Sequence, residues 1–131
     1  MSNNARSVAH TPSEAEALAQ LDDKFEAEER DPNWSGPAAT QATRALTSDL
    51  PSGSTLGSVE CRTNLCRVES SHPSLDAFQS FVHSALLSRD KKLWNGGFSA
   101  QVVAQGPLGV KAVTYIAKEG QAVPQLEPVR D

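Results

Sequence analysis

Two cysteines separated by four residues constrain the fold of this chain more than any other feature. Cys61 and Cys66 are its only cysteines. If they face each other in an antiparallel pair, Glu60 lies opposite Arg67, and the valines just outside these residues also face each other. All three pairs are chemically matched, and a register slip of one residue would disrupt all of them at once. The sequence therefore predicts a β-hairpin closed by a Cys61–Cys66 disulfide.

Other roles for the two cysteines have weaker support. Free buried thiols remain an alternative, as does redox or metal chemistry. The spacing is not the C-x-x-C that lowers a thiol pKa, and a zinc site with His72 and His83 would match no standard finger spacing. Structural disulfides persist in oxidising compartments. We therefore expect a periplasmic or secreted protein, or a cytoplasmic one if the cysteines are reduced.

The apolar periodicity and the helix-start and turn residues divide the chain into seven elements. Thr11 and Glu14 are predicted to cap the first helix. Helices are expected at about 13–30, 37–49 and 75–86, and strands at about 55–61, 66–71, 98–104 and 110–117. The order α-α-β-β-α-β-β predicts an α+β fold, in which a four-stranded antiparallel sheet has its helices packed on one face.

The two ends of the chain are more polar than its middle. We expect a flexible leader at 1–12, a single α+β domain at 13–118 and a polar, proline-containing tail at 119–131. The start has no charged-then-apolar signal sequence. A polar leader of this kind fits a mature chain from which a secretion signal or lipid-anchor segment has been removed.

Charge and motifs exclude several classes of function. The net charge of −4 disfavours nucleic-acid binding, which needs a positive surface. No apolar run is long enough for a membrane span. There is no G-x-S-x-G nucleophile motif, and no pattern that names a catalytic residue, a metal site or a cofactor. An enzyme is therefore disfavoured.

Four side chains are candidates for binding a protein or small-molecule partner. Trp34 and Trp94 each lie beside residues that break secondary structure, where they could cover the ends of the core or form an exposed aromatic contact. Arg62 and Arg67 flank the hairpin turn. The partner itself is not indicated.

The hairpin also carries a resemblance. The segment from Val59 to Glu69 has the pattern V-E-C-R-x-x-x-C-R-V-E, and an acidic helix and an R-D-P-x-W element at 30–34 precede it. A looser match follows at 115–120. Together these residues resemble an uncharacterised bacterial family of small secreted or lipid-anchored domains. The resemblance implies a location in the cell envelope and supplies no activity.

Two functions remain from these observations. The first is a non-enzymatic structural or protein-interaction domain of the bacterial cell envelope, in which a partner adds to a sheet edge or packs on an uncovered sheet face. The second is a redox or metal-handling protein that uses Cys61 and Cys66. Titration of thiols with and without reductant would distinguish the two.

Overall fold

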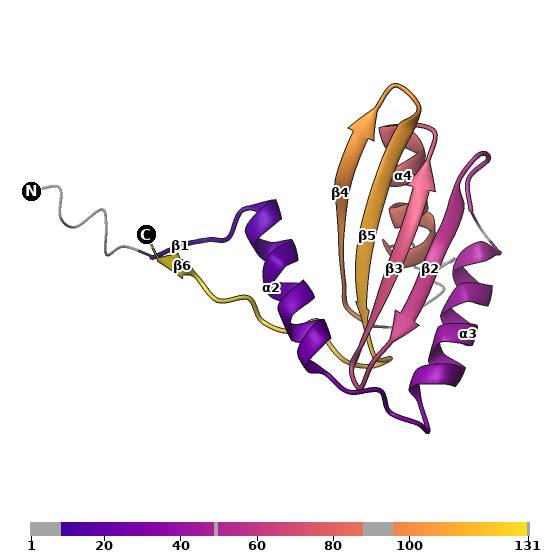
Figure 1. The fold of residues 1–131 in the computed structure, drawn as a ribbon. Coiled ribbons are helices and arrows are strands. Elements are labelled where there is room, and N and C mark those ends of the chain that lie inside the picture. Colours follow the sequence, from indigo (N-terminus) through magenta and orange to yellow (C-terminus); the bar gives the residue numbers. More distant parts are fainter. Residues whose placement is uncertain (1–8, 49, 88–95, 131) are drawn as a thin grey trace, which may run out of the picture.

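The fold is an α+β domain built on one four-stranded antiparallel sheet, as the computed structural model shows (Figure 1). The structure describes residues 9–48, 50–87 and 96–130. Its helices are α2 (Glu14–Ala27), α3 (Ser35–Thr47) and α4 (Leu75–Val82), which continues as the π-helical turn η1 (His83–Leu87). The sheet strands are β2 (Thr55–Cys61), β3 (Leu65–His72), β4 (Phe98–Gly106) and β5 (Gly109–Ala117). The predicted class and order of elements are confirmed, and the strand order is β2-β3-β5-β4.

The cysteine hairpin has the predicted register. Cys61 pairs with Cys66, Glu60 with Arg67, and the two valines with each other. Further from the turn, a bulge at Gly57 shifts the pairing of β2 with β3. Cross-strand matching over only a few residues was therefore enough to specify this part of the sheet.

The second hairpin joins β4 to β5 through a tight turn at 107–108, and its geometry requires glycine. Gly109 has a φ of +130°, which side chains other than glycine rarely adopt. A Cβ atom at this position would lie 2.2 Å from the carbonyl oxygen of His72. The glycine thus allows the start of β5 to approach the end of β3.

Two helices cover one face of the sheet, and this is where the main core lies. Ala38, Ala42 and Leu46 of α3 pack with Phe81 of α4 and with the two cysteines. The small residues of α3 allow its backbone to approach the sheet closely. The helix begins at Ser35, slightly earlier than expected.

The first helix, α2, differs from the expectation that all helices share one face. Leu21 and Phe25 of α2 pack against Leu65, Val113 and Tyr115. These strand residues alternate with those that contact α3 and α4, so their side chains point to the opposite face. Figure 1 shows α2 on the other side of the sheet from α4. The apolar stripe was predicted correctly, but the face that it covers was not.

The cap of α2 also differs from the expected one. Ser13 is the N-cap, and it forms a reciprocal capping box with Glu16 in place of Thr11 with Glu14. The prediction was wrong by two residues because the segment offers several hydroxyl and carboxylate side chains at similar spacing.

The segment after β5 returns along α2. Val123 and Leu126 pack against the apolar stripe of α2. Gln20 donates a hydrogen bond from its side chain to the carbonyl of Glu127 (2.8 Å) and accepts one from its N–H (2.8 Å). The short strands β1 (Ala9–His10) and β6 (Val129–Arg130) then pair next to α2. The sequence of this polar, proline-containing tail did not indicate that it would pack against α2.

Candidate functional site

The disulfide lies inside the core. The structure contains a Cys61–Cys66 bond, and both residues are 0% exposed. The N–H of Arg62 donates to the carbonyl of Leu65 (2.8 Å), so the neighbouring cysteine pair is the closer, non-hydrogen-bonded type. The Cα atoms of the cysteines are 3.9 Å apart. The bond packs against the alanines of α3, where a partner thiol has no direct access to it.

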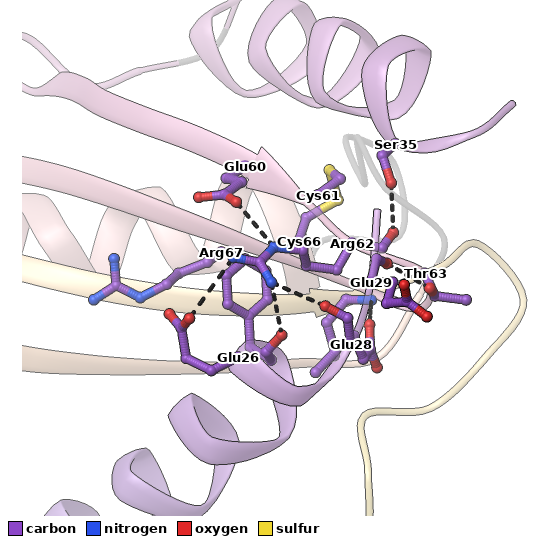
Figure 2. Close-up of polar contacts among 12 residues, drawn as sticks. Glu26, Glu28, Glu29, Ser35, Glu60, Cys61, Arg62, Thr63, Cys66 and Arg67 are labelled. Carbon is purple, nitrogen blue, oxygen red and sulfur yellow. Dashed lines mark hydrogen bonds and ion pairs between the residues drawn. A yellow bond between two sulfur atoms is a disulfide. The ribbon is translucent and has the colours of Figure 1, made fainter. Parts of the chain in front are cut away.

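Arg62 projects from the hairpin turn to the C-terminal end of α2 (Figure 2). Its guanidinium donates hydrogen bonds to the carbonyls of Glu28 (2.9 Å) and Phe25 (3.5 Å). The guanidinium also lies 4.6 Å from the centre of the Phe25 ring, and its Nε is 2.9 Å from the carboxylate of Glu60. A helix C-terminus carries unsatisfied carbonyls and partial negative charge, and a guanidinium complements both. Arg62 therefore fixes the end of α2 on the hairpin.

The rest of the turn strengthens this attachment. The carboxylate of Glu28 accepts hydrogen bonds from the backbone N–H groups of Asn64 (2.8 Å) and Leu65 (3.2 Å). The hydroxyl of Thr63 donates to the carbonyl of Glu29 (2.5 Å). We call the residues from Arg62 to Leu65 the hairpin tip. Both its backbone and its side chains form hydrogen bonds to the C-terminal end of α2 and the residues that follow it.

The hairpin tip is also tied to the start of α3. Ser35 is buried, and its hydroxyl donates to the carbonyl of Arg62 (2.9 Å) while accepting from the N–H of Asp31 (2.8 Å). Ser35 thus connects the linker between α2 and α3 to the disulfide hairpin. Helices on opposite faces of the sheet are joined through one turn, which the disulfide closes.

Arg67 belongs to a polar cluster beneath α2. Its guanidinium bonds Glu69 and the hydroxyl of Tyr115 (3.1 Å), and Tyr115 donates to Asp22 of α2. Partial burial alone would lower the pKa of Arg67, but its hydrogen bonds with Glu69 and Tyr115 outweigh burial and raise that pKa. Burial and the Asp22 contact raise the pKa of Tyr115 well above its ordinary value of 10.0. This cluster joins α2 to the sheet.

Of the two tryptophans, the structure describes only Trp34. Trp34 is half-buried, packs at the margin of the core near α3, and has the Lys118 ammonium 5.1 Å from the centre of its ring. This placement agrees with a residue that covers the end of the core. Trp94 lies outside the described residues.

His72, the last residue of β3, is buried. Its two ring nitrogens lie 2.8 Å from the hydroxyls of Ser54 and Ser70. Burial lowers the pKa of His72, so the neutral ring is favoured. The rings of Phe78 and Phe81 lie against the His72 ring in tilted orientations, with ring centres 5.4 Å and 5.3 Å away. With both nitrogens satisfied by hydroxyls inside the core, His72 has a structural role.

The described part of the chain has neither a cluster of metal-binding side chains nor a helix suited to span a membrane. No group of three or more His, Cys, Asp or Glu side chains there is placed to hold a metal ion. In the same ranges, no helix combines the length and the apolarity that crossing a bilayer requires.

Part of the sheet face beside α2 is open. Gly57, Glu69 and Lys111 from three neighbouring strands line a shallow cavity of about 240 Å³ together with Val103. Glu69 and Lys111 are exposed and of opposite charge, and Val103 is 46% exposed. Strand alternation places the side chains of Glu69 and Lys111 on one face. The sequence could have indicated them only if the strand order had been known.

No family model, curated protein or solved structure matches this chain.

Proposed function

We propose that this chain is a non-enzymatic protein-interaction domain of the bacterial cell envelope, stabilised by the Cys61–Cys66 disulfide. Membership of the bacterial family that the hairpin motif resembles is part of the same proposal. The observation that carries it is the complete burial of the disulfide beneath α3. A bond in that position stabilises the fold and needs an oxidising compartment to form and persist.

The burial of the sulfurs also argues against the redox alternative. Thiol–disulfide exchange proceeds by direct attack of a thiolate on a sulfur atom. Both cysteines are 0% exposed, and the alanines of α3 pack over them. The hairpin tip is also bound to α2, so the segment around the bond is held from both sides.

The open part of the sheet face is the surface that we assign to the partner. It combines a shallow cavity with one exposed carboxylate, one exposed ammonium and an exposed valine. Mixed polar and apolar side chains of this kind are typical of non-obligate protein interfaces. The arginines first considered for this role, Arg62 and Arg67, bond the residues of α2 and β3.

The oxidation state and the location can be tested together. Thiols are titrated in denaturant on protein isolated from the envelope fraction and from the cytosol of cells that express the protein from its natural gene. We expect the protein in the envelope fraction, with no reactive thiol before reduction and two after it. Reactive thiols in the untreated protein, or a protein confined to the cytosol, would refute the envelope proposal.

The interaction surface needs a separate experiment. A photo-crosslinking amino acid replaces Lys111 on the open sheet face, and in the control it replaces Thr40, which is exposed on α3. We expect one discrete crosslinked protein from position 111 and none from position 40. Equal crosslinking from both positions would show that the open face has no special role.

A further inference from the structure

The outer edge of β4 is unusual for an exposed sheet edge. Its sequence, FSAQVVAQG, contains no charged residue and no proline. Among the described residues, β4 has one strand neighbour, β5, and Figure 1 shows it at the margin of the sheet. Natural proteins usually protect such an edge with charges, prolines or bulges. Both edge strands have a bulge, at Gly57 in β2 and at Val103 in β4, but β2 also carries the charged Glu60 and has α3 packed beside it.

The register shows which backbone groups of β4 point outward. The N–H of Ala117 donates to the carbonyl of Gly97, so this pair is bonded within the sheet. In antiparallel pairing, hydrogen-bonded and non-hydrogen-bonded pairs alternate. The backbone groups of Phe98, Ala100 and Val102 therefore point away from β5. They form a regular set of donors and acceptors along five residues, from 98 to 102.

The side chains of the same residues are half-buried. Phe98 packs at the margin of the main core, and Ala100 and Val102 pack at the margin of the cluster under α4. Ser99 and Gln101 alternate with them and point to the other face. The edge thus presents an apolar row on one face and a polar row on the other, each only partly covered by its own molecule.

We propose that β4 pairs antiparallel with β4 of a second copy of this chain, with the twofold axis at Ala100. This register uses all three outward-facing residues, because Phe98 then faces Val102 of the second copy and Ala100 faces its equivalent. The two outer pairs each join an aromatic to a β-branched side chain, a favourable combination, and the central pair joins two alanines. On the other face Ser99 lies opposite Gln101. The two sheets become one continuous eight-stranded sheet.

Charge supports a second copy as the occupant. The chain has a net charge of −4, so two copies repel each other, and a contact surface without charged side chains adds no close repulsive pair to that repulsion. Residues 97–106 carry no charge, and the twofold register brings no like charges together. The bulge at Val103 ends the regular edge, so the pairing covers residues 98–102. This inference does not depend on the proposed function.

The association is tested by sedimentation equilibrium of the purified, oxidised full chain over a range of concentrations. We expect a monomer–dimer equilibrium. The variant with Ser99→Glu and Gln101→Glu places a glutamate opposite a glutamate twice in each dimer. At about 0.2–1 kcal/mol for each cross-strand pair, the dimer dissociation constant should rise roughly 2- to 30-fold. A wild-type protein that remains monomeric at every concentration would overturn the proposal.

Two further variants test the register itself. Ser99→Lys with Gln101→Glu places opposite charges across the dimer, and should restore or tighten association. A control with Thr40→Glu and Gln79→Glu adds the same two negative charges at exposed positions on α3 and α4, and should leave association unchanged. Equal weakening by the control and by the glutamate pair on β4 would contradict pairing through this strand.

Amide hydrogen exchange gives an independent measure on the wild-type protein. The N–H groups of Ser99 and Gln101 bond β5 in either state, so they should be protected at all concentrations. Those of Ala100 and Val102 face outward, so they should become protected only at concentrations where the dimer forms. Protection of these two amides that does not change with concentration would refute the pairing.

Discussion

Removing the Cys61–Cys66 bond is the perturbation that best tests the structural role of the hairpin. Reduction of the wild-type protein adds only two hydrogens, and the packing beneath α3 must adjust as the two sulfurs move from bonding distance to van der Waals contact. Strand register is also held by the neighbouring pairs and by the attachment of the hairpin tip to α2. We therefore expect the reduced protein to remain folded with a lower free energy of unfolding.

The magnitude follows from the size of the closed loop. The cysteines are five positions apart in sequence, so the bond closes a loop of six residues. In the chain-entropy model such a loop restricts the unfolded state by about 2 kcal/mol. For a domain of this size, that difference corresponds to a fall in melting temperature of roughly 8 °C.

The assay is urea denaturation with and without a phosphine reductant, after thiol titration has confirmed complete reduction. The double variant Cys61→Ala with Cys66→Ala serves as the control, and its stability should not respond to the reductant. Because the sulfurs are 0% exposed, reduction of the native protein should be slow and should accelerate in low urea, as local opening exposes the bond. Unchanged stability after complete reduction, or unfolding without any denaturant, would refute this account.

Two other changes test the attachment of α2. Arg62→Ala removes the hydrogen bonds to the end of α2 and the contact with the Phe25 ring, and should lower the free energy of unfolding by about 2–3 kcal/mol in urea denaturation. The control Arg44→Ala, on the exposed side of α3, should change it by less than about 0.5 kcal/mol, and equal effects would contradict the role of Arg62. Tyr115 is the only tyrosine, and its pKa is raised in the folded state, so its contribution to stability is complete below pH 10 and is lost as the pH rises above that value. Its absorbance near 295 nm should therefore change only together with loss of the circular dichroism signal, whereas ionisation at pH 10 in a folded protein would contradict its burial.

The sequence determined the features that depend on near neighbours. The register of β2 with β3 could be predicted because the cysteines, the charged pair and the valines lie within about ten residues, and one slip would mismatch all of them. The order of helices and strands followed from periodicity and from glycine and proline positions. Each of these signals is local, and the structure confirms them.

The tertiary structure decided what the local signals leave open. An apolar stripe shows that α2 must bury Leu21 and Phe25, but either face of the sheet offers apolar side chains. The ion pairs also differ from the simplest expectation: Glu60 bonds Arg62 and Arg67 bonds Glu69, although Glu60 and Arg67 are paired in register. Long side chains choose among several partners, and that choice depends on where α2 comes to lie.

The sequence alone could not predict the open face, nor the edge of β4 that no other strand covers among the described residues. Gly57, Glu69 and Lys111 line one cavity only because β3 lies between β2 and β5. The exposed edge of β4 follows from the same strand order, since an uncharged strand is a binding surface only if no neighbour covers it. The sequence by itself therefore determined the disulfide hairpin and the kind of fold, because those depend on residues close together in the chain. Contacts between distant segments decided which surfaces the molecule presents.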